Sequence, residues 1–208
     1  MSPKTVEEWT AHWNAKAGIE NAIELTGYCI GGVPMSAEKY RAAVVEPCLE
    51  LLELEPQHHV LEVGCGAGLL LREIEQRVER TVGTDVSDGL VRRYDGTAET
   101  YVCAAHELPF DGEQFDRILM YSVAHYFPDL EYFRGVVLAL VGLLRRPGVL
   151  VIGDVPVGAQ PADTPYRWFD RRELADALEP LELPFSIAAQ SRLKRTINRR
   201  YDVVVYKD

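Results

Sequence analysis

The chain has 208 residues, of which 47% are hydrophobic, and this combination favours a globular fold with a core over a disordered chain. Its 22 basic and 32 acidic residues give a formal net charge of −10. Because nucleic-acid backbones bind positively charged surfaces, this balance argues against a nucleic-acid partner. A small or cationic ligand fits the charge better.

The sequence predicts a soluble, cytoplasmic protein with no membrane partner. The N-terminal stretch MSPKTVEEWTAHW lacks the apolar core of a signal peptide. The longest apolar run, residues 135–144, is shorter than the roughly 20 residues that span a bilayer. We expect reduced thiols and no metal site, because neither the histidines nor the scattered cysteines have ligand spacing; the cysteines are Cys29, Cys48, Cys65 and Cys103.

Residues 1–56 indicate a helical N-terminal segment. Thr5 and Glu8 form a capping box for a helix over 5–17, and a glycine-rich loop follows at 26–34. Ser36 can cap a second helix that Pro47 kinks or restarts. We expect this segment to form a lid on residues 57–208, within a single domain that spans 1–208.

From residue 58 onward, strand patterns alternate with helical patterns. The predicted strands are 59–63, 80–85, 99–103, 115–121 and 148–153, and the predicted helices are 68–78, 87–93 and 130–145. This alternation predicts an α/β fold, a doubly wound parallel sheet with helices on both faces. In the tail, 186–195 and 201–207 are strand-like around a turn at 196–200, which predicts an antiparallel hairpin at the sheet edge.

The stretch VLEVGCGAG, residues 60–68, predicts a strand, a glycine turn and the start of a helix. Such a turn can cradle a nucleotide-like ligand, because glycine lets the ligand approach the backbone. Asp85 ends the next predicted strand about 20 residues later, where a carboxylate can accept hydrogen bonds from both ribose hydroxyls. A nicotinamide-binding site is the weaker alternative, because Leu69 stands where its G-x-G-x-x-G pattern has glycine.

These motifs together resemble the class I S-adenosylmethionine-dependent methyltransferases, of the type 11-like, small-molecule branch. VLEVGCGAG is similar to the first motif of the family, VGTDVS to the second, CAAHELPFDGEQFDRILMYSVAHYF to the third and fourth, and LLRRPGVLVIGD to the motif after the sheet. The resemblance implies a Rossmann-like, seven-stranded, mostly parallel sheet whose last strand inserts antiparallel between strands five and six. It also implies S-adenosylmethionine as cofactor and S-adenosylhomocysteine as product.

The resemblance also implies which residues hold the cofactor. Glu62 would orient the turn or contact the amino group of the cofactor. The turn would run close to the methionine part of the cofactor. Asp85 would hold the ribose, and other residues would border the adenine or the sulfonium. The remaining candidates are Gly64, Cys65 and Gly66 in the turn, Val86, Ala105 and His106 at the adenine, and Tyr121 and Ser122 below the methionine and the sulfonium. One position departs from the family: Ala104 stands where an adenine-binding Asp is frequent.

Each cofactor candidate also has a purely structural alternative. Glu62 could cap neighbouring amides, and Asp85 could only cap a helix. Gly68 could serve helix–strand packing.

On the acceptor side, His125 is the candidate general base, because it follows the fourth predicted core strand and imidazole titrates near neutral pH. Tyr28, Tyr126, Asp154 and Arg167 are candidates for contacting the substrate. Trp13 and Tyr40 could face the cofactor, since aromatic rings attract a sulfonium; the alternative is that they only pack.

The leading hypothesis is methyl transfer to an oxygen or a nitrogen of a small-molecule acceptor. One alternative is a catalytically silent, cofactor-binding regulatory protein, and a less favoured one is a nicotinamide-dependent oxidoreductase. The basic stretch RLKRTINRR, residues 192–200, could bind a phosphate or an acidic partner, or could be a solvated turn. The sequence does not indicate which oligomeric state the protein adopts.

Overall fold

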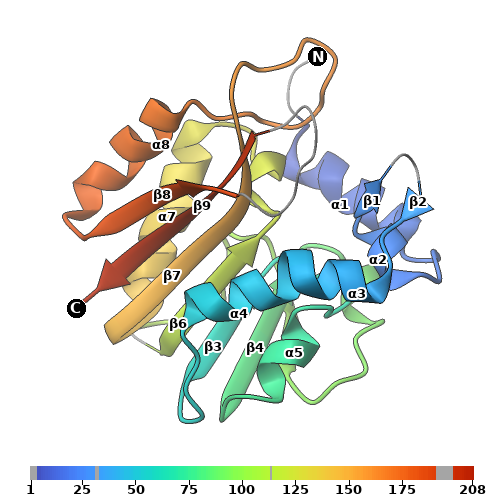
Figure 1. Cartoon of the computed structure of the whole chain (residues 1–208), viewed down its shortest axis with the longest axis horizontal. Helices are drawn as coiled ribbons and strands as arrows, with labels where there is room; N and C mark the ends of the chain where they lie inside the picture. The colour runs from blue at the N-terminus through green and yellow to red at the C-terminus, as the bar shows by residue number, and fades with distance from the viewer. Residues whose placement is uncertain (1–3, 31–32, 113, 191–198) are drawn as a thin grey trace.

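A seven-stranded sheet forms the centre of the molecule in the computed structural model, which describes residues 4–30, 33–112, 114–190 and 199–208 (Figure 1). The strand order is β5-β4-β3-β6-β7-β9-β8. The strands are β3 (His59–Val63), β4 (Arg80–Asp85), β5 (Glu99–Val102), β6 (Phe115–Tyr121), β7 (Leu144–Val157), β8 (Phe185–Ala189) and β9 (Arg199–Lys207).

Only β9 breaks the parallel core, because it runs antiparallel to both β7 and β8. The pairs β3–β4, β3–β6, β4–β5 and β6–β7 are all parallel. The predicted seven-stranded, mostly parallel sheet with an antiparallel C-terminal hairpin is therefore confirmed. The turn predicted at 196–200 falls mostly outside the described residues, and its last two residues belong to β9.

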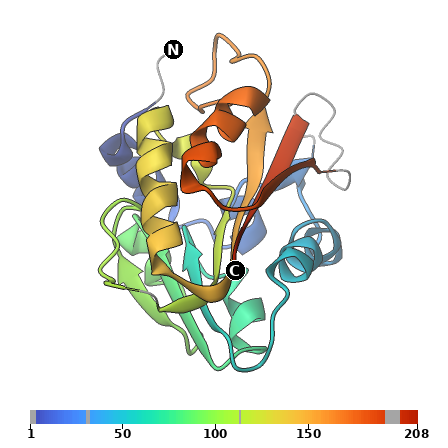
Figure 2. The ribbon, with the colours of Figure 1, turned by 90° about the vertical axis from the view of Figure 1, so that its left-hand side faces the viewer.

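Helices cover both faces of the sheet (Figure 2). They are α1 (Val6–Lys16), α2 (Ala22–Leu25), α3 (Ala37–Tyr40), α4 (Glu46–Leu52), α5 (Leu71–Glu75), α6 (Asp88–Val91), α7 (Leu130–Leu143) and α8 (Arg171–Leu178). A π-helical turn, Arg41–Val45, joins α3 to α4 in one continuous helical stretch, and Pro47 lies in the first turn of α4.

Neighbouring residues of the central strands pack into two separate hydrophobic cores, because successive side chains point to opposite faces of a sheet. Leu119, Val149 and Val151 pack with the segment that contains α3 and α4. Ile118 and Leu150 pack instead against α7 and α8 on the other face. Both faces of the central strands are therefore buried, which explains why the sequences of these strands are continuous apolar runs.

The N-terminal segment is held against α6 by polar contacts. The capping box of Thr5 and Glu8 forms as predicted at the start of α1. Near the end of α1, Asn14 Oδ1 accepts hydrogen bonds from Ser87 Oγ at 2.7 Å and from Gly89 N at 3.0 Å. Arg93 donates to the carbonyl oxygens of Ala17 and Glu20. These contacts place α1 beside the strand end that carries Asp85.

Several elements differ from the sequence prediction. The strand predicted at 148–153 extends over Leu144–Val157, because Leu144 pairs with Phe115 of β6 at its start and pairing with β9 continues past β6 at its end. The helix predicted at 68–78 is regular only over Leu71–Glu75, and the loop at 26–34 contains the short hairpin β1 (Cys29–Ile30) and β2 (Val33–Pro34). Within the described part of the chain, no helix has the length and apolar character needed to cross a membrane.

Candidate functional site

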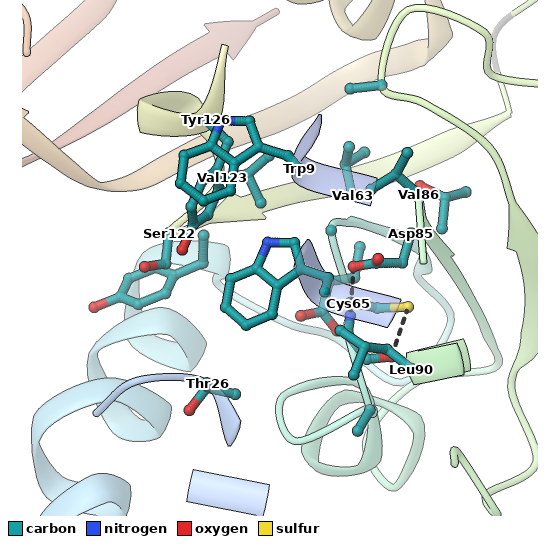
Figure 3. Close-up of a pocket in the computed structure, with 18 of the residues that line it drawn as sticks. Trp9, Thr26, Val63, Cys65, Asp85, Val86, Leu90, Ser122, Val123 and Tyr126 are labelled. Carbon is teal, nitrogen blue, oxygen red and sulfur yellow. Dashed lines mark hydrogen bonds between the residues drawn. The ribbon is translucent and has the colours of Figure 1, made fainter. Parts of the chain in front are cut away.

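A pocket opens at the carboxyl ends of β3, β4 and β6, where ligands bind in open parallel α/β sheets (Figure 3). It encloses about 1110 Å³, including space open to solvent. Helices α1 and α2 supply one wall, and the glycine turn supplies another. Thirteen predicted site residues line it: Trp13, Tyr28, Tyr40, Glu62, Gly64, Cys65, Gly66, Asp85, Val86, Ala105, Tyr121, Ser122 and Tyr126.

The glycine turn has a backbone that only glycine tolerates at its first position. Gly64 has φ +79°, and a Cβ there would lie 2.2 Å from Val123 Cγ2. The N–H groups of Gly64 and Cys65 both donate to the carbonyl oxygen of Thr84, at 2.7 and 2.9 Å. The turn is thereby anchored to β4, and its backbone forms the floor of the pocket.

Asp85 links the turn to the start of α6. Its Oδ2 accepts a hydrogen bond from Gly66 N at 2.9 Å, and its Oδ1 accepts one from Ser87 N at 2.8 Å. Burial raises the pKa of this carboxyl, and the backbone hydrogen bonds oppose that rise. Each carboxylate oxygen can accept a further hydrogen bond. The pocket therefore presents acceptors suited to a pair of ligand hydroxyls.

Glu62 is the second acidic group of the pocket, and it is only 3% exposed. No described residue donates a hydrogen bond to its Oε2 atom. Burial, and then the nearby charge of Asp85, raise the pKa of Glu62 well above its ordinary range. A buried acceptor without a donor is costly, so this position fits a ligand that brings an N–H group.

Aromatic rings form a large part of the pocket wall. The ring of Tyr126 lies edge-on to Trp9 at 4.6 Å and to Trp13 at 5.6 Å between centroids. Tyr28 and Tyr40 form a similar pair at 5.2 Å. These rings come from α1, α3, the loop before β1 and the 3-10 turn Ala124–Tyr126, so this part of the wall is assembled by tertiary packing.

Ser122 follows β6 at the pocket wall, separated from Asp85 by the intervening strand β3 (Figure 3). Its Oγ donates a hydrogen bond to Asp154 Oδ2 at 2.7 Å. Both residues have left-handed backbone conformations, with φ 60° and 58°. Asp154 is 1% exposed, and Arg200 Nε lies 3.7 Å from its Oδ1.

Four predicted site residues do not line the pocket. His125 is buried, and its ring packs against Tyr126 at 4.1 Å and Tyr166 at 5.4 Å between centroids. The ring of the exposed residue His106 contacts the pocket residue Tyr132, with Nδ1 2.7 Å from the hydroxyl. Arg167 lies 3.7 Å from Glu173, and Asp154 reaches the pocket only through Ser122.

The predictions missed other parts of the wall. Leu25 ends α2 and Thr26 follows it, in a stretch without a helical pattern long enough to detect. Tyr132 comes from the first turn of α7, and its position depends on how α7 packs. Trp9 had a visible signal as an aromatic residue on the first helix, four residues before Trp13. The remaining unpredicted wall residues are Val6, Val63, Ala67, Leu69, Leu70, Thr84, Leu90, Cys103, Ala104, Val123 and Phe127.

Residues 61–152 match the family model for a methyltransferase domain, and residues 19–102 match that for protein-L-isoaspartate(D-aspartate) O-methyltransferase. Both matched models describe methyltransferases, and together they span residues 19–152, so this part of the chain is a methyltransferase domain. S-adenosylmethionine is accordingly its cofactor. The predicted family, enzyme class and cofactor are confirmed.

Curated relatives share part of this methyltransferase sequence. Chondramide synthase of Chondromyces crocatus is 34% identical over 125 residues, which are 53% of this chain and 3% of the synthase. The ubiquinone biosynthesis O-methyltransferase of Rhizobium etli is 33% identical over 103 residues, 44% of this chain and 38% of that enzyme. The similarity thus covers well under half of the length of either relative.

Solved structures share the fold over nearly the whole chain. Magnesium protoporphyrin IX methyltransferase from Synechocystis, with bound S-adenosylmethionine, has a TM-score of 0.71 at 16% identity and covers 99% of both chains. Phosphoethanolamine N-methyltransferase 1 of Haemonchus contortus has a TM-score of 0.76 at 12% identity, covering 97% of this chain and 48% of that one. The [4+2]-cyclase SpnF has a TM-score of 0.72 at 15% identity, covering 100% and 98%.

The pocket of this methyltransferase fits the cofactor chemically. Asp85 offers acceptors for ribose hydroxyls, and the unpartnered Oε2 of Glu62 offers one for an amino group. Gly64 and Gly66 add no side chain to the lining of the pocket, and at Gly64 a Cβ would clash with Val123. Val86, Leu90 and Ala105 add apolar surface for a flat base.

Proposed function

We propose that the chain transfers the methyl group of S-adenosylmethionine to a nitrogen or an oxygen of a small-molecule acceptor. One observation carries the proposal: the polar floor of Asp85, Glu62 and the glycine turn and the aromatic wall of Trp9 and Tyr126 line the same pocket. The polar floor suits a nucleoside with a charged tail. The aromatic wall suits a compact acceptor held beside that nucleoside.

The bound cofactor supplies a methyl group on positively charged sulfur, which a nucleophile can take directly. The residues of the chain therefore mainly bind, orient and exclude water, and positioning of this kind contributes roughly 7–11 kcal/mol. Buried Trp9 and Tyr28 limit the access of water on the aromatic side. The aromatic faces also favour a cationic group over an anionic one.

The similar proteins support both kinds of acceptor atom. One has a name that specifies O-methylation in ubiquinone biosynthesis, and another acts on the nitrogen of phosphoethanolamine. We propose that this chain acts on a free small molecule and not on nucleic acid, because the chain carries a net charge of −10.

The base role predicted for His125 remains a hypothesis with a geometric requirement. Its ring packs behind Tyr126 and Tyr166 and does not line the pocket, so proton removal by His125 would need a rearrangement of these rings. We propose that His125 supports the pocket by holding Tyr126 in place.

Two measurements test the proposed function. In calorimetry, we expect S-adenosylmethionine and S-adenosylhomocysteine to bind and NAD not to bind. In a transfer assay with methyl-labelled cofactor, we expect label to move to at least one member of a pool of small amines and phenols. Tight NAD binding without sulfonium binding would support an oxidoreductase. Cofactor binding without transfer to any pool would support a silent binding protein.

A further inference from the structure

We propose that Tyr132 is a positioning residue for the base of the cofactor. Its hydroxyl holds His106, and His106 fixes the loop that follows β5 and borders the base; this loop, residues 103–107, is the base loop. The inference rests on the part of the proposed function that concerns the cofactor. It does not depend on the identity of the methyl acceptor.

The order of the strands indicates where the base lies. β5, β4 and β3 are neighbours in the sheet, in that order. Asp85 at the end of β4 is the proposed ribose contact, and Glu62 on β3 is the proposed contact of the amino group. The tail of the cofactor therefore runs from β4 toward β3. The base, on the other side of the ribose, then lies toward β5, where the pocket is lined by Cys103, Ala104 and Ala105.

The base loop offers the ligand little besides its backbone. Cys103 N donates to the carbonyl oxygen of Asp85 at 3.0 Å, which ties the start of the loop to β4. Ala104 and Ala105 then line the pocket with methyl groups and main-chain atoms. Glu107 N donates to the carbonyl oxygen of Ala104 at 2.9 Å and closes a turn. How well the loop fits a base therefore depends on how firmly its far end is held.

His106 is the point at which the base loop contacts α7. Its Nδ1 lies 2.7 Å from the Tyr132 hydroxyl, and the two rings are edge-on at 5.0 Å between centroids. The backbone of His106 also hydrogen-bonds to this hydroxyl. One hydroxyl thus holds both the ring and the main chain of a single loop residue.

The hydrogen-bonding capacity of the Tyr132 hydroxyl can be assigned. His106 Nε2 lies 3.6 Å from Glu107 Oε1, which favours the hydrogen of a neutral imidazole on Nε2 and leaves Nδ1 as an acceptor. Burial raises the pKa of Tyr132 to about 12, so the hydroxyl keeps its hydrogen at neutral pH and donates it to Nδ1. Its oxygen accepts from the His106 N–H. The hydroxyl therefore acts on the loop and not directly on the ligand.

Tyr132 is itself held by the start of α7. Asp129, the N-cap of α7, accepts a hydrogen bond from Tyr132 N at 2.8 Å. The Tyr132 ring packs against buried Phe127 at 4.8 Å between centroids. The half-exposed His106 is thereby joined to a fixed helix start. A loop that is already in place when the ligand arrives reduces the entropy cost of binding.

Calorimetry with S-adenosylhomocysteine and with adenosine tests this role. Tyr132→Phe removes the hydroxyl and keeps the ring. We expect both ligands to bind about fivefold more weakly, the equivalent of one net hydrogen bond, because both ligands carry the base. In the ligand-free variant, amide hydrogen exchange should become faster in the base loop and stay unchanged in the core half of α7.

A second substitution separates positioning through His106 from a general structural role. His106→Ala removes the ring and keeps the backbone. In the His106→Ala protein, Tyr132→Phe should reduce the affinity for S-adenosylhomocysteine by a smaller factor than in the wild type, because the hydroxyl has already lost one of its two partners. Equal factors in the two backgrounds would show that Tyr132 does not act through His106, and would overturn the inference.

Tyr101→Phe is the matched control. It removes a hydroxyl that donates to Glu99 at 3.2 Å on β5, directly before the base loop, and it should bind both ligands as the wild type does. A folded Tyr132→Phe protein that binds both ligands within about twofold of the wild type would overturn the inference. A loss confined to S-adenosylhomocysteine would do the same, because it would place the effect at the tail.

If Tyr132→Phe does not fold, His106→Ala decides alone. It should weaken the binding of both ligands by about threefold, since one of the two contacts remains, and wild-type affinity in this variant would overturn the inference. A wild type that binds neither ligand would overturn the proposed function as well.

Discussion

Asp85 is the residue on which cofactor affinity should depend most. It accepts backbone hydrogen bonds from the glycine turn and from the start of α6, so its loss would loosen the turn and remove the proposed ribose contact. We expect Asp85→Ala to weaken binding of S-adenosylhomocysteine by at least about tenfold, or roughly 1.4 kcal/mol. Calorimetric titration measures the change.

The control for this substitution is Asp95→Ala, which removes an exposed carboxylate after α6 that pairs with Arg72. Its affinity should match that of the wild type. An Asp85→Ala protein that folds and binds within twofold of the wild type would show that the carboxylate does not hold the ribose.

Glu62 should make the stability of the ligand-free protein depend on pH. An unfolded glutamate loses its proton near pH 4.5, whereas burial raises the pKa of Glu62 in the folded state. Between these two values the native state holds more protons than the unfolded state, so the unfolding free energy decreases as pH rises. Below pH 4.5 the contribution is fully present.

Glu62→Gln removes this titration and preserves the shape of the side chain. Urea unfolding at pH 5 and pH 8, without cofactor, should show a smaller loss of stability on raising the pH in Glu62→Gln than in the wild type. The comparison reports Glu62 together with its coupling to Asp85, because the Asp85 charge contributes to the raised pKa of Glu62. Equal losses in the two proteins would mean that Glu62 is ionised when folded.

Among the elements, α1 depends on Trp9 for its docking. This 3%-exposed indole stacks on Tyr166 at 5.3 Å and lies edge-on to Tyr126 at 4.6 Å. Truncating a buried aromatic ring to alanine costs about 3–5 kcal/mol in a core. We expect Trp9→Ala to speed hydrogen exchange in α1 much more than in α7, because α7 packs in a separate core.

Tyr101→Ala is the corresponding control, since Tyr101 is a partly exposed ring on the edge strand β5. It should leave exchange in α1 unchanged. If Trp9→Ala accelerated exchange equally in α1 and α7, then α1 would unfold only with the whole molecule and could not act as a separate lid.

For the molecule as a whole, the net charge of −10 should prevent binding to nucleic acid. Non-specific complexes at physiological salt have dissociation constants of about 10⁻⁴ to 10⁻⁶ M, and they depend on positive surfaces. Fluorescence anisotropy with labelled single-stranded RNA at about 0.15 M salt should therefore show no binding tighter than about 10⁻⁴ M. Tighter, salt-sensitive binding would reopen nucleic acid as a substrate.

The sequence predicts the fold and the cofactor side of the pocket because both depend on local patterns. The bounds predicted at 59–63, 80–85 and 115–121 match β3, β4 and β6, whose buried residues form apolar runs. The glycine turn and Asp85 are likewise recognisable from short spacings.

The acceptor side could not be predicted in the same way. It joins Tyr126, which the sequence does predict, with Trp9 and Tyr132, which are far from it in the chain, and tertiary packing brings them together. Left-handed conformations at Ser122 and Asp154 have no sequence signal, because neither residue is glycine. Their hydrogen bond became visible only with the register of β6 and β7.

Asn14 has a consequence for the rate of turnover. Its side-chain oxygen holds Ser87 and Gly89, the residues that start α6 directly after Asp85. If α1 covers the bound cofactor as a lid, spent cofactor leaves only when these two hydrogen bonds break. If methyl transfer is fast once cofactor and acceptor are bound, product release would then limit the turnover rate.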